Sequence, residues 1–335
     1  MQRSCHPGRL YRPFMRGMAI YKNPSLPRVP NDEDLYDGTV RFQHKQQEFE
    51  LNTKWQDTMP SGSASGTVVT LHGSPGSHND FKYITHYLRP MGIRSIGLNF
   101  PGKGFTDAHP DFRYDNDERD AYIYAMLDKI GVGERIIWLA HSRGNENALR
   151  CAVRTADKTK GLVLVNATGL QMHKGIRPHW VIQLAAWADR TNAVTRAVMN
   201  PITYFIYQRM GLLAPNQDVT AKCVQTMTTF EFSGLQKQID QFNKELTFPM
   251  VQLMAGRDFL IEDHIVKEFF SKFANGEEKT LHPSSDDEEQ AIEFVRERLN
   301  GGHRATLLNF PEDGHFLQKH RARLIAETCQ MMLKN

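Results

Sequence analysis

Short apolar runs alternate with helical patterns along most of the chain after residue 67. Six runs have the length and composition of buried strands, at residues 68–73, 93–100, 135–142, 161–168, 249–256 and 305–310. Residues 80–91, 117–131 and 144–153 show the apolar spacing of helices between them. This alternation predicts an α/β fold, with a mostly parallel central sheet and helices on both faces. Upstream, the period-two pattern of residues 40–55 predicts one or two antiparallel edge strands.

The chain between the fourth and fifth of these strands is too long for a plain connection. It runs for about eighty residues without a strand pattern, and connections of that length seldom lack structure of their own. We therefore predict a helical cap at residues 170–248, inserted between core segments at 39–169 and 249–335, with a basic arm at 1–38. The aromatic side chains of the cap are expected to be buried, over an active site or on the core: Trp180, Trp187, Tyr204, Phe205 and Tyr207.

The charge balance limits the range of partners. The chain has 41 Lys and Arg against 38 Asp and Glu, a net charge of +3, and no basic stripe interleaved with aromatics. This pattern predicts no nucleic-acid partner. Residues 1–31 contain six basic residues and no acidic one, which is typical of a mitochondrial presequence, but five prolines there would interrupt an amphipathic helix. We expect a cytoplasmic protein, with a mitochondrial location as the alternative.

Cysteine usage and ligand spacing argue against cross-links and metals. The four cysteines, Cys5, Cys151, Cys223 and Cys329, are far apart and form no CxxC pair, which predicts reduced thiols in an intracellular protein. No apolar run approaches the ~18 residues that span a bilayer. Because no group of His, Cys and Asp has the spacing of metal ligands, we expect neither a metal nor another cofactor.

The strongest chemical signal is the pentapeptide AHSRG at residues 140–144, between a predicted strand and a predicted helix. It is close to G-x-S-x-G, the nucleophile elbow, in which a sharp turn holds a serine in a strained conformation with its hydroxyl exposed. Such a turn needs small residues two positions before and after Ser142. Gly144 meets this requirement, and Ala140 exceeds it by one methyl group. A serine that merely caps a helix is the alternative interpretation.

A glycine-containing loop, HGSPG at residues 72–76, directly follows the first central strand. Gly73 and Gly76 let the backbone approach its neighbours closely. Acyl transfer needs two donors for a developing oxyanion, and we predict the backbone N–H groups of Ser74 and Arg143 for that role. An ordinary strand-to-helix turn is the alternative.

Two later motifs supply candidate partners for the serine. The DGHF motif at residues 313–316 follows the last strand, and its His315 is the predicted general base. The GRD motif follows the strand at 249–256, and its Asp258 is predicted to orient His315 and to stabilise the imidazolium. Glu262 and Asp263 lie close by in the sequence and are better suited to capping the next helix.

These motifs together carry a family resemblance. HGSPG, AHSRG, GRD and DGH resemble the α/β-hydrolase superfamily in order and spacing, over residues 40–335. The set is similar to single-domain hydrolases with a helical cap, such as epoxide hydrolases, dehalogenases and carbon–carbon hydrolases. Epoxide hydrolases and dehalogenases carry an aspartate as nucleophile, so Ser142 implies ester, thioester or related acyl chemistry.

The longer strings HGSPGSHNDFKYI and AGRDFLIE resemble a nematode family of α/β-hydrolases with no assigned substrate. The chain departs from the superfamily pattern at two places. Asn145 stands where many members have a second glycine after the elbow. Only Arg257 separates Gly256 from Asp258, where many members have two residues.

The predicted function is that of a serine hydrolase acting on a small-molecule ester, thioester or related acyl substrate. Two alternatives stay open. One is a non-catalytic ligand-binding or interaction protein on a hydrolase scaffold. The other is a lipase-like or acyltransferase enzyme whose cap contacts a membrane through the amphipathic stretch 194–213.

Overall fold

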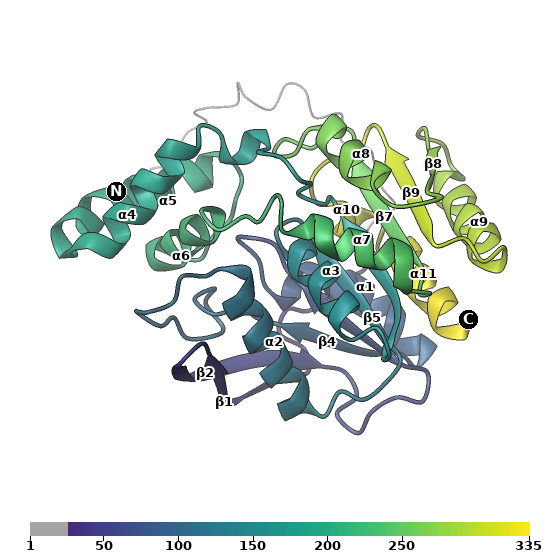
Figure 1. Cartoon of the computed structure of the whole chain (residues 1–335), viewed down its shortest axis with the longest axis horizontal. Helices are drawn as coiled ribbons and strands as arrows, with labels where there is room; N and C mark the ends of the chain where they lie inside the picture. Colours follow the sequence, from purple (N-terminus) through teal and green to yellow (C-terminus); the bar gives the residue numbers. More distant parts are fainter. Residues whose placement is uncertain (1–25) are drawn as a thin grey trace, which may run out of the picture.

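The computed structural model describes residues 26–335, and its centre is a nine-stranded sheet (Figure 1). The strands follow the order β1-β2-β4-β3-β5-β6-β7-β9-β8. The β1–β2 and β2–β4 pairs are antiparallel, and every other neighbouring pair is parallel. The bounds are Leu35–His44 (β1), Gln47–Asp57 (β2), Thr67–Leu71 (β3), Arg94–Leu98 (β4), Ile136–His141 (β5), Thr159–Val165 (β6), Met250–Ala255 (β7), Glu277–Thr280 (β8) and Ala305–Phe310 (β9).

Helices connect these strands and cover the sheet. Within residues 26–335, the α-helices are Lys82–Leu88 (α1), Asn116–Ile130 (α2), Gly144–Arg154 (α3), His179–Thr191 (α4), Ala193–Arg209 (α5), Gln217–Met227 (α6), Leu235–Glu245 (α7), Asp263–Ser271 (α8), Asp287–Asn300 (α9), Leu317–His320 (α10) and Ala322–Lys334 (α11). None of them is both long enough and apolar enough to cross a membrane.

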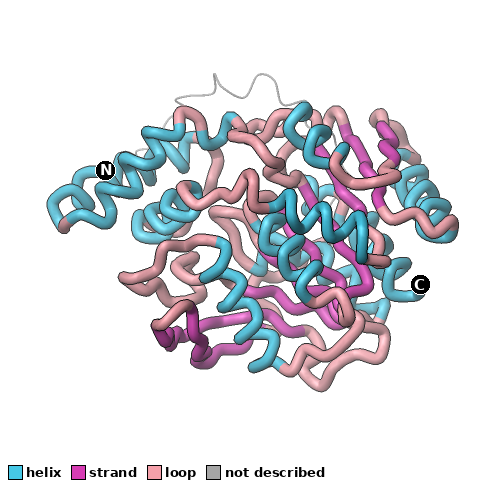
Figure 2. Tube along the Cα trace, viewed as in Figure 1, coloured by secondary structure: helices cyan, strands magenta, loops and turns pink. Residues whose placement is uncertain are grey.

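The apolar strands fill two cores, one on each face of the sheet, and helices lie around the strands (Figure 2). Successive residues of a strand point to opposite faces, so a strand covered on both sides is apolar at every position. Val69 and Trp138 pack in one core with α2, α3 and α7, and Val68 and Ile137 pack in the other with α1, α9 and α11. The fold is therefore the α/β-hydrolase arrangement that the sequence predicts.

Local capping explains where a helix such as α2 begins and ends. The Asp115 carboxylate accepts a hydrogen bond from the Glu118 N–H at 3.0 Å, and the Glu118 carboxylate accepts from Tyr114 N–H. These bonds satisfy N–H groups that a helix start leaves without partners. Gly131 ends the helix at a φ of +69°, in the left-handed region that favours glycine.

The long connection between β6 and β7 is helical, as predicted. Its helices α4, α5 and α6 stand at one end of the molecule, whereas α7 packs beside α3 on a face of the sheet (Figure 1). The expectation that the aromatic side chains of this region are buried is wrong for Trp180, Trp187 and Phe205, which are all exposed. Tyr207 is buried as expected. Packing of α4 and α5 on each other and on α6 leaves their outer faces uncovered.

The edges of the sheet hold one confirmed and one missed prediction. Residues 40–55 form parts of both β1 and β2, the antiparallel pair expected there. The short strand β8, with the sequence EEKT, was not predicted, because it has no apolar residue and exists only by pairing with β9.

Cys151, Cys223 and Cys329 are buried free thiols. Cys5 and most of the basic arm lie outside the described residues.

Candidate active site

Ser142 stands at the turn between β5 and α3, where the elbow motif predicts it. Its φ is +52°, in the left-handed region that non-glycine residues seldom adopt. Its N–H donates to the carbonyl oxygen of Val165 at 2.9 Å, and its own carbonyl accepts from Asn145 N–H at 3.0 Å. The Ser142 hydroxyl has no hydrogen-bond partner among residues 26–335 and borders a cavity, so it is available to a ligand there.

Close backbone packing explains the two glycines around this turn. A Cβ at Gly144 would lie 2.3 Å from the carbonyl oxygen of Leu71 and 2.8 Å from that of His72. A Cβ at Gly73 would lie 3.1 Å from the Cβ of Ser142. Gly73 and Gly144 therefore have one cause, since the loop after β3 runs directly against the turn after β5.

The two predicted oxyanion donors lie on neighbouring loops. β3 and β5 are parallel neighbours, so the loop with Ser74 and the turn with Arg143 meet at the same edge of the sheet. Ser74 and Ser142 line the same cavity. Neither the Ser74 N–H nor the Arg143 N–H has an acceptor within the described part of the chain. Both groups are thus free to bind a negatively charged oxygen.

The side chain of Arg143 has a second task that the motif did not reveal. Its buried guanidinium donates to Asn116 Oδ1 at 2.9 Å, to Glu146 Oε2 at 2.8 Å and to the carbonyl oxygen of Thr229 at 3.0 Å. It also lies 4.6 Å from the centre of the Phe230 ring. Thr229 and Phe230 follow α6, so Arg143 ties the serine turn to the base of the helical insertion.

His315 and Asp258 are in direct contact. His315 Nδ1 lies 2.7 Å from Asp258 Oδ2, and both side chains are almost fully buried. Burial alone would raise the pKa of Asp258. However, hydrogen bonds from His315 and from the N–H groups of Leu260 and Ile261 hold that pKa below its ordinary value. The ionised Asp258 accepts a hydrogen bond from Nδ1–H, which leaves Nε2 as the nitrogen that can accept a proton.

The structure also separates Asp258 from its two neighbours in sequence. The carboxylate of Glu262 accepts a hydrogen bond from Lys174 N–H at 2.8 Å, and Asp263 lies in the first turn of α8. Neither forms a hydrogen bond with His315 in the described structure. Of these three carboxylates, Asp258 is therefore the one that meets the histidine, despite the shortened spacing before it.

Two buried side chains hold the loop that carries His315. His141 Nε2 and Asn166 Nδ2 both donate to the carbonyl oxygen of His315, at 2.9 and 2.7 Å. Asn166 Oδ1 accepts from Ala255 N–H at 3.0 Å, so this residue connects the ends of β6 and β7. The rings of His141 and His315 are 4.8 Å apart between centroids, which puts His315 beside the turn of Ser142. No direct hydrogen bond joins Ser142 to His315 in the described structure.

Asn166 was missed by sequence reasoning. Its signal in the sequence is weak, an asparagine directly after a buried strand, and its φ of +47° becomes visible only in the structure. Asparagine tolerates the left-handed region better than most residues do, because its short side chain bonds locally. The residue positions the His315 loop rather than bordering the cavity.

The remaining histidines of the two central motifs have structural tasks. Burial lowers the pKa of His72 and of His141 to about 3, so both rings are neutral. His72 Nδ1 donates to the carbonyl oxygen of Gly73 at 2.8 Å, and its Nε2 accepts from Phe100 N–H at 3.0 Å. Because both nitrogens are engaged, His72 does not compete with His315 as a base.

Lys103 is a buried cation beside the predicted oxyanion donor, and the sequence analysis did not select it. Its Nζ donates to Thr226 Oγ1 at 2.8 Å and to Ser74 Oγ at 3.3 Å. No carboxylate of the described residues forms an ion pair with it. Burial, together with the charges of Arg119 and Arg143, lowers the pKa of Lys103 to about 8. The ammonium is thus still charged at neutral pH and makes the surroundings of Ser74 positive.

The cavity beside Ser142 has a volume of about 210 Å³ and a mostly apolar wall. Apolar side chains reach it from the insertion and from the loop that follows α6, among them Ile182, Met199, Val224, Met227 and Phe230. Enclosed apolar pockets with a few converging polar groups are the usual form of small-molecule sites. The serine, the free N–H groups and the apolar wall together suit a molecule with an acyl chain.

A second, more open hollow of about 540 Å³ adjoins the first, and Leu212 lines both. Lys103, Asp80 and Lys319 line its polar part. Burial raises the pKa of Asp80 to about 6, although the charge of Lys319 opposes this rise. An elongated ligand that reached both would thus meet apolar side chains in the cavity and charged side chains in the hollow.

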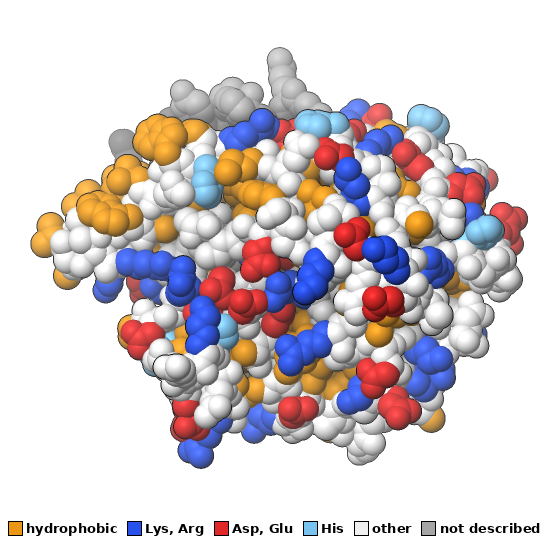
Figure 3. All heavy atoms as spheres, viewed as in Figure 1, with side chains coloured by type: hydrophobic (Ala, Val, Ile, Leu, Met, Phe, Trp, Pro, Cys, Tyr) orange, Lys and Arg blue, Asp and Glu red, His pale blue; other side chains and the backbone are white. Residues whose placement is uncertain are grey.

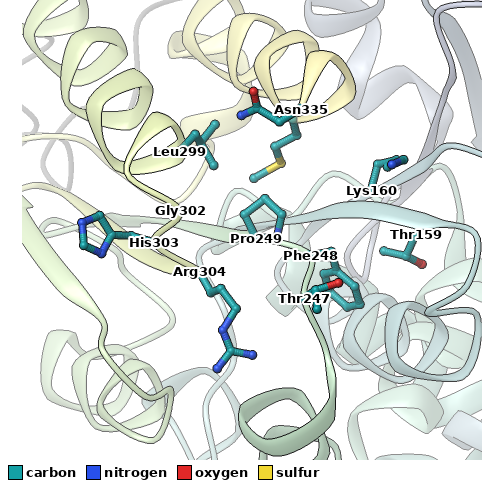
Figure 4. A pocket seen from close by; sticks show the side chains of 11 residues that line it. Thr159, Lys160, Thr247, Phe248, Pro249, Leu299, Gly302, His303, Arg304 and Asn335 are labelled. Carbon is teal, nitrogen blue, oxygen red and sulfur yellow. The ribbon is translucent and has the colours of Figure 1, made fainter.

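A cavity of about 260 Å³ lies at the opposite edge of the sheet (Figure 4). Thr159 begins β6, and Pro249 and Arg304 immediately precede β7 and β9, so this is the amino edge of the strands. Arg304 is occupied there by the carbonyl oxygens of Phe242 and Asn243, each at 3.0 Å. Ligands of open α/β sheets bind at the carboxyl edge, where Ser142 stands. We therefore do not assign this cavity to the active site.

One cluster of the described residues has the spacing of metal ligands. His44, Asp115 and Glu118 each offer one atom within 4.8 Å of the others. Both carboxylates already accept hydrogen bonds from backbone N–H groups at the start of α2. The cluster is thus explained as a helix cap, and it contains none of the residues that line the Ser142 cavity.

Comparison with known proteins gives two findings at the level of sequence. A family model described as alpha/beta hydrolase of unknown function (DUF1057) matches residues 32–334. An uncharacterized protein of Caenorhabditis elegans is 32% identical over 286 residues, which cover 83% of this chain and 80% of the relative.

Solved structures extend the likeness to enzymes of known type. An esterase from Thermogutta terrifontis superposes with a TM-score of 0.58 at 15% identity, over 87% of this chain and 95% of the esterase. A putative ancestral haloalkane dehalogenase superposes with a TM-score of 0.59 at 15% identity, over 89% and 98%. At such identities the likeness shows the fold alone. Because esterases and dehalogenases share this fold, the chemistry has to be argued from the residues of the site.

Proposed function

The chain belongs to the family of α/β hydrolases of unknown function, and on that premise we propose that it is a serine hydrolase of ester, thioester or related acyl substrates. Ser142 is the nucleophile, His315 the general base and Asp258 the acid that orients the base. The observation that carries this proposal is the buried 2.7 Å hydrogen bond between His315 and Asp258. A buried hydrogen bond to a carboxylate costs the desolvation of its charge and adds little net stability, so a catalytic task accounts for it better than a structural one.

The reaction follows from the positions of these groups. His315 Nε2 takes the proton of the Ser142 hydroxyl as Oγ attacks the acyl carbonyl carbon. The negative oxygen of the tetrahedral intermediate binds the N–H groups of Ser74 and Arg143. The intermediate collapses, and the alcohol or thiol leaves with the proton from His315. Water then attacks the acyl-enzyme while His315 removes its proton, which releases the acid and restores Ser142.

The surroundings support an acyl substrate in particular. The acyl chain lies in the apolar cavity beneath α4, α5 and α6, which act as a lid. Lys103 acts through its hydrogen bond to Ser74 by adding positive charge behind the oxyanion. The Ser142 hydroxyl has no hydrogen-bond partner among the described residues, so its oxygen is free to attack the acyl carbon.

The test is covalent labelling with a fluorophosphonate probe, read by intact mass, together with turnover of a series of p-nitrophenyl esters. Wild-type protein is expected to gain one adduct and to hydrolyse at least one ester. Ser142→Ala is expected to gain no adduct and to lose turnover by several orders of magnitude, since removing the nucleophile disables the whole triad.

Ser74→Ala is the matched control, because Ser74 lines the same cavity and the variant keeps the backbone N–H proposed to bind the oxyanion, losing only the hydroxyl that accepts from Lys103 Nζ. It is expected to gain the adduct and to keep measurable turnover. Folded wild-type protein that stays unlabelled and inactive would contradict the proposal and favour a non-catalytic binding protein. Labelling of Ser142→Ala would assign the nucleophile to another residue.

A further inference from the structure

The outer surface of α4 and α5 is unusually apolar. Of the thirteen large hydrophobic side chains exposed in residues 26–335, twelve lie between Met172 and Leu213, and Tyr36 is the exception. Trp180 is 65% exposed and Val194 74% exposed. Figure 3 shows these hydrophobic side chains gathered over the two helices. Soluble monomers seldom expose an apolar patch of more than a few hundred Å², so such a patch marks an interaction surface.

Helical spacing organises these side chains into stripes. On α4, Trp180, Leu184 and Trp187 follow one another at intervals of four and three residues, and on α5 Val194 and Val198 do so at an interval of four. Side chains at such intervals share one face of a helix. We call the surface formed by Trp180, Leu184, Trp187, Val194, Val198, Ile202 and Phe205 the apolar face.

The apolar face is continuous with the Ser142 cavity. Val181, Ile202, Ile206 and Met210 are each more than a third exposed, and each also lines the cavity. The same side chains therefore belong to the outer surface and to the wall beside the serine. These side chains offer an acyl chain an apolar route from the apolar face into the cavity beside Ser142.

The charged residues of the insertion itself are almost all basic. Residues 170–216 contain five Lys and Arg and a single acidic residue, Asp189. Asp189 is buried, and its carboxylate is bound by Lys222 at 2.7 Å and by Asn200 at 2.9 Å. Residues 1–31 add six basic residues and no acid. Asn31, the last residue of this range, lines a hollow with Leu213 of the insertion.

We propose that the apolar face docks on the surface of a bilayer that contains anionic lipids, and that lipid esters enter the Ser142 cavity from that bilayer. The choice of substrate rests on the proposed hydrolase function, whereas docking does not. An interfacial helix buries aromatic and aliphatic side chains at the lipid boundary while nearby Lys and Arg bind anionic headgroups. None of the described helices can cross the bilayer, so α4 and α5 lie on it.

Flotation with lipid vesicles tests docking directly. Wild-type protein and Ser142→Ala are both expected to float with vesicles of phosphatidylcholine and phosphatidylserine, and more weakly with phosphatidylcholine alone or at high salt. Each exposed Trp contributes a factor of about ten to partitioning. The double variant Trp180→Ser, Trp187→Ser is therefore expected to bind about a hundredfold more weakly. Tyr36→Ser changes the exposed aromatic outside the face and is expected to float like wild type.

Three results would overturn docking. They are absence of vesicle binding, vesicle binding that the double Trp variant leaves unchanged, and a wild-type dimer that this variant dissociates while vesicles remain unbound. The last result would assign the apolar face to a second copy of the chain. Circular dichroism of the double Trp variant checks its fold. Because both side chains are exposed, their replacement is not expected to change the spectrum.

The substrate is tested with two esters, a soluble p-nitrophenyl acetate and a diacylglycerol held in anionic vesicles. The double Trp variant is expected to keep the acetate turnover of wild type and to lose most diacylglycerol turnover, because neither Trp lines the cavity. If wild type hydrolyses the acetate and not the lipid, lipid entry is wrong and the hydrolase function stands. If neither ester is hydrolysed and no probe adduct forms, the hydrolase function fails, and flotation still decides docking.

Discussion

Replacement of Lys103 by methionine is expected to make the protein more stable and less active. The Lys103 ammonium is buried without a carboxylate partner among residues 26–335, and hydroxyl groups of Thr226 and Ser74 are its hydrogen-bond acceptors. Methionine has a similar length and no charge, so it can fill the same space. The change therefore removes a buried charge with little effect on packing.

The size of the effect follows from the pKa. Burial lowers the pKa of Lys103 to about 8, from 10.5 for an ordinary lysine. That difference corresponds to about 3 kcal/mol by which the folded state disfavours the charged amine. Two hydroxyl acceptors lose their donor in the variant, which costs about 1 kcal/mol. We therefore expect Lys103→Met to raise the free energy of unfolding by about 2 kcal/mol at neutral pH.

The dependence on pH has a definite sign. Between pH 8 and 10.5 the unfolded chain binds a proton at Lys103 that the folded protein does not, so wild-type stability rises with pH across this interval. The advantage of Lys103→Met is thus expected to be full below pH 8, to reach zero before pH 10.5, and above that pH to become a disadvantage of about 1 kcal/mol from the lost hydrogen bonds. Ester turnover should fall by about tenfold, less than the loss of a direct oxyanion donor, because Lys103 acts through Ser74.

Urea denaturation of wild type and Lys103→Met at several pH values measures these differences. Lys158→Met is the matched control, because Lys158 is exposed, and it should change stability by less than about 0.5 kcal/mol. A Lys103→Met variant that is less stable than wild type at neutral pH, or a gain that persists at alkaline pH, would refute the account of a buried ammonium without a carboxylate partner. Unchanged turnover would remove Lys103 from the proposed mechanism.

Three further predictions concern the turn, the acid and the buried histidines. Gly144→Ala is expected to lower the free energy of unfolding by about 1–3 kcal/mol, measured by urea denaturation, because its Cβ would meet the Leu71 carbonyl oxygen at 2.3 Å. Asp258→Asn should lower ester turnover by about 10⁴-fold while circular dichroism stays unchanged, because the amide no longer holds the His tautomer; retained activity would exclude Asp258 as the orienting acid. The urea midpoint of wild type should fall as the pH drops below 6.5, because His72 and His141, with pKa values of about 3 when folded, bind protons first in the unfolded chain; a midpoint that is flat down to pH 3 would contradict their burial as neutral rings.

The exposed tryptophans show most clearly where sequence reasoning stops. Composition alone predicts that Trp180 and Trp187 are buried, since large aromatic side chains usually gain from burial. The structure leaves both exposed, because the helices of the insertion use other faces to pack on one another. Which face of an amphipathic helix is covered depends on segments far away in the chain. The spacing of apolar residues along the helix does not identify those segments.

The sequence by itself determined the succession of apolar strands and helices along the chain and the place of each motif, including Ser142 at its tight turn and the loop with Ser74. Those features depend on local chain geometry, such as strand periodicity and the space that glycine leaves. Only the tertiary structure decided what the Arg143 side chain holds, and that Asn166 and Lys103 lie beside the candidate site. Such residues act across loops that approach one another only after the sheet has formed, so no spacing along the chain encodes their contacts.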